Sequence, residues 1–283
     1  MTQKKLVIFI PSIEGGGVEK NLFIISNFLI KKINKLSIIT TSHKSKKKFK
    51  KGINIILPKY KFWDNLSRIY KYFICLLILF KYLISNKNST VLAFQANLYC
   101  VIICKILSVK VIVRSNSDPA GWANNLIKRH TYKFLINKSD KVIVNSIDFK
   151  NKMKKKFNVN SQVIYNPLNK VEVVKKSKLI KKSFYPKKCL KIINIGRLVD
   201  QKDHLTLLKS LNLIKNKINF HAIIMGSGIL KDELIKYIKK QNLSNCVKLI
   251  SYKKNPYPFI NQADLFILSS KYEGLPNVLL EAI

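Results

Sequence analysis

Short apolar runs typical of strands alternate with helical patterns along nearly the whole chain. LVIFI at residues 6–10 is followed by apolar residues at helical spacing over 17–32 and by LSIIT at 36–40. Further runs repeat this rhythm: TVLAF, KVIVR, KVIVN, QVIYN, LKIINIG, FHAIIMG, CVKLIS and ADLFILSS. Strand, helix and strand in succession form a parallel sheet covered by helices. The sequence therefore predicts an α/β fold.

The length of the chain points to two domains. A chain of 283 residues exceeds the ~100 to 150 residues of a typical single domain. A polar, lysine-rich stretch lies between the two series of strand-like runs, so we expect an N-terminal Rossmann-like domain over 1–170 and a second over 171–283. Ligands of such sheets bind outside the carboxyl ends of the strands. The residues that follow each strand are thus the candidates for a cleft between the domains.

The net charge of +39 suggests a polyanionic partner, either nucleic acid or an anionic membrane surface. Lysine supplies nearly all of this charge, while isoleucine and asparagine are plentiful, as in the codon usage of an AT-rich genome. The chain shows no helix-turn-helix, zinc-finger or aromatic RNA-binding motif, and arginine, the preferred reader of guanine, is scarce. We therefore expect no nucleic-acid partner and keep a basic nucleic-acid-binding protein as the lesser alternative.

The most hydrophobic stretch is YFICLLILFKYLI at residues 72–84. It contains Lys81 and is shorter than the ~20 residues that span a bilayer. We expect a buried helix here, and the alternative is a helix lying in the membrane interface. The five cysteines lack zinc-ligand spacing, and the N-terminus lacks a signal-peptide pattern, so we expect reduced thiols and a cytoplasmic location.

Three glycines follow the first strand-like run. Gly15, Gly16 and Gly17 open the next helix, where they allow close backbone approach and leave helix amides available to an anion. The dinucleotide fingerprint needs a glycine where this chain has Lys20, which argues against a nicotinamide site. A tight turn without a ligand is the alternative.

Two cations follow the first strand-like run of the second domain. Arg197 comes directly after Gly196, and Lys202 stands where the next helix begins, an arrangement suited to a diphosphate. After the next run, Gly226 and Gly228 form a turn that we expect to lie against a nucleobase or phosphate.

Two glutamates follow ADLFILSS. Pro276 suits the first position of a helix. Glu273 then stands before that helix and Glu281 inside it, so that the two carboxylates hold different parts of one extended ligand. A glycosidase acid and base is the alternative use of such a pair. The chain has no Asp-x-Asp pair for a metal-bound nucleotide, so we expect chemistry without a metal.

Three segments resemble the donor half of glycosyltransferase family 4, whose members have the two-domain GT-B fold. They are NIGRLVDQKDHLTLLKSL, MGSGILKDELIKYIKK and SSKYEGLPNVLLEA, and GGGVEKNLF is similar to the acceptor-side glycine loop of that family. The resemblance covers essentially the whole chain and is strongest over residues 190–283.

The resemblance implies retaining transfer of a sugar from a nucleotide diphosphate sugar, with a UDP-sugar favoured, and no cofactor or metal. By it, Arg197 and Lys202 stabilise the departing diphosphate, Glu273 holds sugar hydroxyls and Glu281 binds the ribose. The other implied donor-binding residues are Gly196, Gly226, Gly228, Gly274, Leu275, Pro276 and Asn277, the amides of Leu275 to Asn277 approaching phosphates or sugar.

On the acceptor side, the resemblance implies roles for Gly15, Gly16, Gly17 and Glu19. Many family members carry a histidine after a late strand of the first domain, where this chain has KVIVRSNSDPAG. Arg114, Asn116 and Asp118 are therefore cleft candidates, and a polar loop is the alternative.

The implied acceptor is a lipid-linked, lipopolysaccharide or capsule glycan precursor, met peripherally at the inner face of the cytoplasmic membrane through anionic lipid. Family members continue beyond Glu281, whereas this chain ends at Ile283. We therefore expect a truncated second domain with low stability and little activity, and a catalytically inactive remnant is the alternative function.

Overall fold

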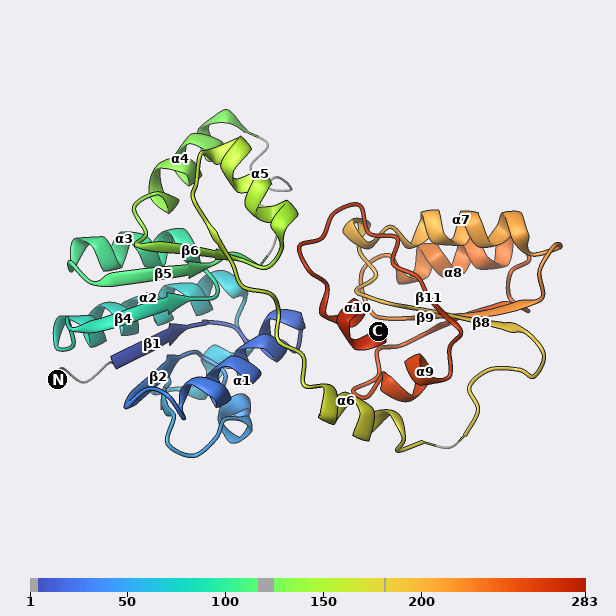
Figure 1. The fold of residues 1–283 in the computed structure, drawn as a ribbon, viewed down its shortest axis with the longest axis horizontal. Helices are drawn as coiled ribbons and strands as arrows, with labels where there is room; N and C mark the ends of the chain where they lie inside the picture. The colour runs from blue at the N-terminus through green and yellow to red at the C-terminus, as the bar shows by residue number, and fades with distance from the viewer. Residues whose placement is uncertain (1–4, 117–124, 181) are drawn as a thin grey trace. The chain divides into compact units, whose positions relative to one another are not determined.

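The computed structural model describes residues 5–116, 125–180 and 182–283. The chain forms two compact units, Met1–Pro167 and Leu168–Ile283, here called the N-unit and the C-unit. Each unit has its own parallel sheet with helices packed on it (Figure 1).

The sheet of the N-unit has the strand order β3-β2-β1-β4-β5-β6-β7, and all neighbouring strands are parallel. The strands are β1 (Lys5–Phe9), β2 (Lys35–Ile39), β3 (Asn54–Ile56), β4 (Ser89–Ala93), β5 (Lys110–Arg114), β6 (Lys141–Val144) and β7 (Gln162–Val163). The order reverses between β1 and β4, and such switch points are where open α/β sheets bind ligands.

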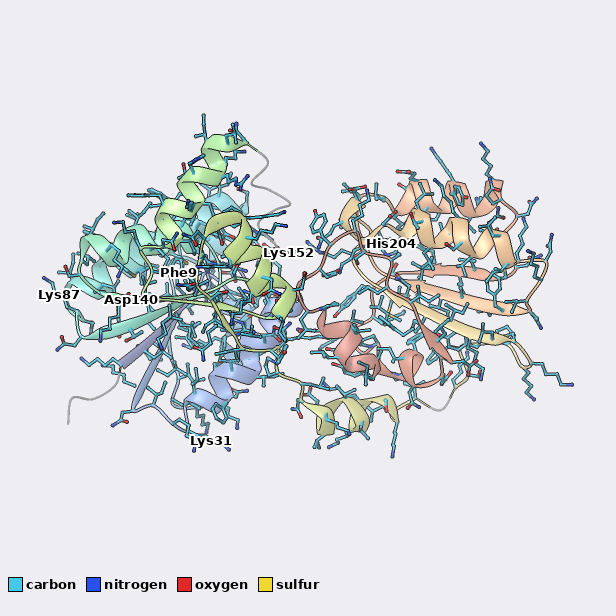
Figure 2. The ribbon with its side chains drawn as sticks, turned by 45° about the horizontal axis from the view of Figure 1, so that its top comes forward. Phe9, Lys31, Lys87, Asp140, Lys152 and His204 are labelled. Atoms are coloured by element: carbon cyan, nitrogen blue, oxygen red, sulfur yellow. The ribbon has the colours of Figure 1, made fainter. Side chains whose placement is uncertain are left out.

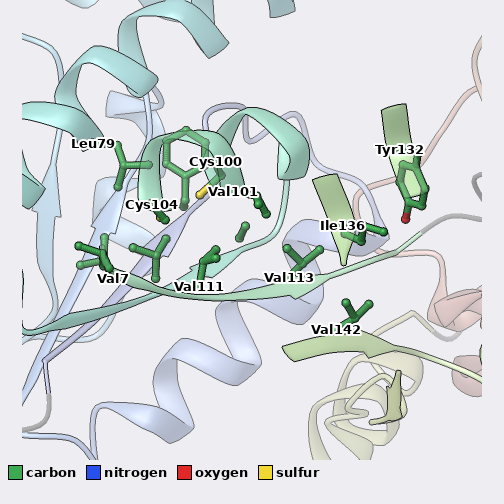
Figure 3. Packing of buried hydrophobic residues seen from close by; sticks show 14 of the residues in the cluster. Val7, Leu79, Cys100, Val101, Cys104, Val111, Val113, Tyr132, Ile136 and Val142 are labelled. Carbon is green, nitrogen blue, oxygen red and sulfur yellow. The ribbon is translucent and has the colours of Figure 1, made fainter. Parts of the chain in front are cut away.

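Helices cover both faces of this sheet. They are α1 (Gly17–Leu29), α2 (Arg68–Ile84), α3 (Asn97–Ile106), α4 (Leu126–Ile136) and α5 (Ile147–Phe157), with short 3₁₀ helices η1 (His43–Lys48) and η2 (Lys61–Asn65). Leu22 of α1 packs on one face of the sheet, and α2 to α5 pack on the other. On that second face Leu79, Cys100 and Ile136 meet Val111 and Val113 of β5 (Figure 3).

The hydrophobic stretch at 72–84 lies within α2. Cys75, Leu79 and Leu83 are fully buried, whereas Ile69 and Phe73 on the opposite side are 78% and 59% exposed. The expectation of a buried helix is therefore wrong for half of its circumference, because α2 packs on one face of the sheet and only one stripe of a helix can make that contact. Within the described ranges, no helix combines the length and the apolar character needed to cross a membrane.

The C-unit is built on a sheet of order β10-β9-β8-β11, again with all neighbours parallel. Its strands are β8 (Leu190–Ile195), β9 (Phe220–Met225), β10 (Val247–Ile250) and β11 (Leu265–Phe266). Its helices are α6 (Lys170–Ser177), α7 (His204–Ile214), α8 (Lys231–Lys240), α9 (Tyr257–Asn261) and α10 (Asn277–Ala282), with η4 (Asp200–Lys202) before α7. Every strand-like run predicted from the sequence contains a strand, which confirms the α/β fold class.

Candidate functional site

In the C-unit, the segments that follow β8 and β11 leave the sheet at the same edge. The two strands are parallel neighbours, with Ile192 opposite Leu265 and Ile193 opposite Phe266. We call the segment at 196–203 the β8 loop and the segment at 268–276 the β11 loop. Parallel pairing therefore places together two groups of predicted donor-binding residues that are far apart in the sequence.

Hydrogen bonds hold the β8 and β11 loops to each other. The Lys271 amide donates to the Gln201 carbonyl oxygen at 2.9 Å, and the Gln201 side-chain amide donates to the Tyr272 carbonyl oxygen at 3.0 Å. The Ser269 hydroxyl also donates to the Lys202 carbonyl oxygen at 3.0 Å. These bonds fix the backbone from which the candidate side chains project.

Lys202 and Glu273 form an ion pair across these loops. The ammonium group of Lys202 contacts Oε1 of Glu273, and the two side chains are only 14% and 21% exposed. A Cβ on Gly196 would lie 3.5 Å from both Cγ and Cδ of Lys202, so the lysine side chain extends over this glycine. Partial burial reduces water screening and strengthens the attraction relative to an exposed pair. The structure thus brings together a predicted cation and a predicted carboxylate.

Arg197 lies in the same β8 loop as Lys202 and is exposed. Its guanidinium group has no ion pair or hydrogen bond with any residue in the described part of the chain. A guanidinium offers a planar fork of donors that matches phosphate oxygens. The carboxyl end of β8 therefore presents a cation suited to an anionic ligand.

Gly226 and Gly228 allow the segments after β8 and β9 to pack closely. A Cβ on Gly226 would lie 1.9 Å from the Gly196 carbonyl oxygen, and one on Gly228 would lie 2.3 Å from the Leu198 carbonyl oxygen. The Leu198 amide donates to the Ser227 carbonyl oxygen at 2.9 Å. These contacts give both glycines a structural role, while their predicted contact with a nucleotide stays a prediction.

The end of the β11 loop leads into α10. The helix begins at Asn277 with Pro276 as its N-cap, so the sequence placed Pro276 one position too far into the helix. The extended backbone of Pro276, with ψ of 122°, accounts for the difference. Glu281 lies in α10, and its side chain is half-buried, as are Gly274 and Leu275.

His204 is a residue of this region that the sequence did not single out. It is 1% exposed, begins α7 and follows Lys202 by two residues. Neither ring nitrogen has a hydrogen-bond partner among the residues placed by the structure. Burial, assisted by the Lys202 charge and opposed by Asp203, lowers the pKa of His204 to about 4. The ring is therefore neutral at neutral pH. Aspartate is a common N-cap residue, so Asp203 could have marked the start of α7 and the position of His204 in its first turn.

In the N-unit, the glycine loop follows β1 as predicted. Gly15 has φ of +94°, Gly16 is the N-cap of α1 and Gly17 is its first residue. Glu19 is buried, and its Oε1 accepts a hydrogen bond of 3.4 Å from the Glu14 amide. The Glu19 carboxylate thus turns back over the loop and stabilises its conformation.

A hollow of about 340 Å³ lies beside this loop. Its lining residues are Ile13, Glu14, Gly15, Phe23, Thr41, Ser42, Lys44, Ser45, Lys48, Asp64 and Lys71. Both acidic groups have cationic or imidazole partners, since Glu14 pairs with Arg68 at 2.9 Å and Asp64 with His43 at 2.8 Å. Hydrogen bonding by Ser12 and the Arg68 charge lower the pKa of Glu14 despite its partial burial. Lys71 also lies 3.7 Å from Glu14, so Lys44 and Lys48 are the lining lysines not paired with these carboxylates, and together with the hydroxyls of Thr41, Ser42 and Ser45 they offer donors to an anion.

Arg114 lies inside the N-unit. It is buried on β5, and it donates hydrogen bonds to Asn166 Oδ1 at 2.9 Å and to the Ile164 carbonyl oxygen at 3.3 Å. Burial lowers its pKa. These contacts hold the Arg114 side chain inside the N-unit at the end of β5, and its predicted role in a cleft stays a prediction. Asn116 donates to the Phe94 carbonyl oxygen at 3.2 Å, and Asp118 lies outside the described residues.

Across the ranges that the structure describes, no group of three or more histidine, cysteine, aspartate or glutamate side chains could hold a metal ion. All five cysteines are free thiols.

Comparison with solved structures defines the class of the fold. The crystal structure of Anabaena HepE in complex with UDP-glucose matches 98% of this chain and 77% of its own, with a TM-score of 0.78 and 15% identity. The chain has the GT-B fold, as the resemblance of its sequence segments predicted.

Residues 175–283 match the family model described as "Glycosyl transferases group 1". An uncharacterized glycosyltransferase of Methanocaldococcus jannaschii is 44% identical over 92 residues, which cover 32% of this chain and 23% of that protein. The N-acetylgalactosamine-N,N'-diacetylbacillosaminyl-diphospho-undecaprenol 4-alpha-N-acetylgalactosaminyltransferase of Campylobacter jejuni is 28% identical over 166 residues, 56% of this chain and 43% of that protein. The matched segments therefore span less than half the length of these relatives, and the family match covers mainly the C-unit.

Proposed function

We propose that the protein is a retaining glycosyltransferase of family 4, and that it takes a sugar from a nucleotide diphosphate sugar, with UDP as the favoured nucleotide. The GT-B fold and the family match over 175–283 support this class of activity. The observation that carries the proposal is the joining of Lys202 and Glu273 beside Gly196 at the carboxyl ends of β8 and β11. A diphosphate and a polyhydroxylated sugar need a cation and a carboxylate side by side.

In the proposed reaction, the bond between the anomeric carbon of the sugar and the diphosphate oxygen breaks. The nucleoside diphosphate leaves with the electron pair, a bond forms between the anomeric carbon and the acceptor hydroxyl oxygen, and the hydroxyl proton is released. Arg197 and Lys202 stabilise the charge that develops on the leaving diphosphate. Glu273 accepts hydrogen bonds from sugar hydroxyls, and Glu281 accepts them from the ribose.

We propose that these two cations neutralise the diphosphate without a metal ion. Arg197 is exposed at the end of β8, and Lys202 is held in place by Glu273 and by the packing of its side chain over Gly196. Two cations beside the diphosphate would supply the electrostatic stabilisation that a divalent ion supplies elsewhere.

For the acceptor, we propose a lipid-linked glycan precursor or another lipopolysaccharide or capsule precursor, met at an anionic membrane surface. The Campylobacter relative is named for a diphospho-undecaprenol acceptor. The hollow beside Gly15 has lysines and hydroxyls suited to a phosphate of such an acceptor. The net charge of +39 favours an anionic surface.

Calorimetric titration with UDP and with GDP in the presence of a metal chelator tests the donor site. We expect UDP to bind and GDP to bind more weakly. Arg197→Ala and Glu281→Ala should each weaken UDP binding by roughly tenfold or more, because each removes a charge-assisted hydrogen bond worth ~1.5 to 3 kcal/mol.

Lys271→Ala is the matched control. Lys271 also lies in the β11 loop and pairs with an acidic group, Asp200 at 2.6 Å, but this pair is exposed and has no proposed role. We expect its UDP affinity to stay within about twofold of the unsubstituted protein. Absence of binding to both nucleotides, or binding only after a divalent metal is added, would contradict the proposal.

A further inference from the structure

The outward side of α2 is an apolar stripe. Ile69, Phe73, Leu77, Phe80 and Ile84 recur at helical spacing on the side opposite the buried Cys75, Leu79 and Leu83, and all five are exposed. A surface helix of a globular protein normally carries polar residues on its outer side. Both sides of α2 are apolar, so packing within the N-unit accounts for only half of its hydrophobic residues.

The apolar stripe continues onto the neighbouring helices. α2 contacts α3 and α3 contacts α4, so the three helices lie side by side on one face of the sheet. Exposed apolar side chains of these neighbours are Tyr99, Ile102 and Ile106 on α3 and Ile127 and Phe134 on α4. We call the outward sides of the three helices the α2–α4 surface. Groups of large exposed apolar side chains on adjoining helices mark interaction sites.

The three helices contribute only basic charges to the α2–α4 surface, although Glu14 pairs with Arg68 and Lys71 of α2, and Asp140 pairs with Lys105 of α3. The sequences of α2, α3 and α4 contain no aspartate or glutamate, while Lys81, Lys128 and Lys133 are exposed. Lys87, which follows α2, is also exposed, and it points away from the unit (Figure 2). Lysines that flank large apolar side chains are the pattern of helices that lie in a membrane interface.

A second hollow lies at the α4 end of this surface. It has a volume of about 270 Å³ and is lined by Leu126, Arg129, His130, Lys133 and Lys156. Its charged groups are cationic, and Arg129 is held in position by a 3.1 Å hydrogen bond to the Lys156 carbonyl oxygen. The hollow has the size and charge to receive a lipid phosphate next to the apolar stripe.

We infer that the α2–α4 surface docks on a lipid membrane that contains anionic lipids, with the apolar stripe in the interface and the lysines among the headgroups. Charge complementarity selects this partner. A second copy of the chain on the same surface would bring cationic groups against cationic groups. This inference deepens the membrane part of the proposed function by naming the surface that makes the contact.

Binding of the full chain to vesicles tests the inference. We expect binding to phosphatidylcholine vesicles that contain about 30% phosphatidylglycerol, and much weaker binding to phosphatidylcholine alone. The triple substitution Ile69→Ser, Phe73→Ser and Leu77→Ser should weaken binding to the anionic vesicles at least about tenfold, because it removes the apolar area that enters the interface. Because all three side chains are exposed, the variant should keep the thermal unfolding midpoint of the parent.

A matched triple substitution in the C-unit serves as the control. Leu213, Ile218 and Ile229 are also exposed apolar residues, but they lie outside the α2–α4 surface. Their replacement by serine should leave vesicle binding within about twofold. Equal losses in the two triple variants would overturn the inference, because binding would then depend on general hydrophobicity.

A second measurement locates the membrane contact without removing the apolar stripe. The fluorescence of tryptophan introduced by Phe73→Trp should be quenched by brominated lipid in anionic vesicles, whereas that of tryptophan introduced by Leu213→Trp should not. Both variants keep the native tryptophans, so the parent protein gives the background signal. A stable dimer that the α2 substitutions dissociate, together with absence of vesicle binding, would assign the surface to a second copy and overturn the inference. Loss of UDP binding with vesicle binding intact would overturn the transferase proposal alone.

Discussion

Lys202, Asp203 and His204 are consecutive residues with three different electrostatic conditions. Lys202 is paired with Glu273, and Asp203 caps α7 by accepting a hydrogen bond of 3.3 Å from the Thr206 amide. His204 is buried without a hydrogen-bond partner among the described residues. Because burial and the Lys202 ammonium both oppose protonation, this histidine is a packed neutral ring at the start of α7.

His204 should make stability depend on pH. Its pKa is lowered to about 4 in the folded state from an ordinary value of 6.5. Between these two values the unfolded chain binds a proton and the folded chain does not, so stability is fully present above pH 6.5 and is lost as the pH falls toward 4. We expect the free energy of unfolding to decrease by about 2 kcal/mol between pH 7 and pH 5 from this group alone.

Urea denaturation of His204→Leu and His130→Leu at both pH values isolates this effect. Leucine fits an apolar site and does not titrate, so His204→Leu should lose most of the decrease. His130 is exposed, and its replacement should leave the decrease as in the parent. If His204→Leu and the parent lost the same stability between pH 7 and pH 5, the buried ring would not be the cause.

At the scale of elements, the close contact of the segments after β8 and β9 sets the shape of the candidate site. Gly226→Ala should reduce the free energy of unfolding by about 3 kcal/mol or more, because its Cβ would lie 1.9 Å from the Gly196 carbonyl oxygen. Urea denaturation measures this loss. The backbone atom cannot rotate away as a side chain could.

Gly15→Ala is the comparison for this substitution. Nothing lies within 4 Å of a Cβ at Gly15, but its φ of +94° is unfavourable for alanine. We therefore expect a smaller loss of about 1 kcal/mol from backbone strain. Equal losses at the two positions would show that the β8 and β9 segments can separate at little cost.

The elements were predictable from the sequence where a long apolar run marked a buried strand. The three-residue β3 was not predicted; it is short and lies at the edge of the sheet, where Asn54 is exposed. The sequence also did not show which side of α2 would be buried, since its buried and exposed sides are both apolar. The local sequence pattern shows which residues of a helix are hydrophobic, whereas the sheet determines which side of the helix is buried.

The candidate site was predictable to a similar degree. The sequence places Lys202 and Glu273 each after a strand, and the parallel pairing of β8 with β11 brings them into contact. The burial of Arg114 was not predictable, because its partner Asn166 is distant in the sequence. The sequence around a polar residue at a strand end is the same whether its side chain faces a ligand or a neighbouring segment, so the sequence alone does not distinguish the two.

At the scale of the whole molecule, the net charge of +39 should act on stability and on membrane binding in opposite directions. Repulsion between like charges destabilises the compact chain, and salt screens it with a Debye length that falls from ~30 Å at 0.01 M to ~8 Å at 0.15 M. The same screening weakens the attraction between lysines and anionic lipid.

Raising potassium chloride from about 10 to 200 mM should therefore increase the free energy of unfolding by on the order of 1 kcal/mol and reduce binding to anionic vesicles at least about tenfold. Urea denaturation and vesicle sedimentation measure the two changes on the same preparation. Choline chloride should reproduce both effects, because screening depends on ionic strength and not on the cation. Vesicle binding that stayed unchanged over this range of salt would contradict the prediction, and the membrane attraction would then rest on the apolar stripe of α2 and not on the lysines.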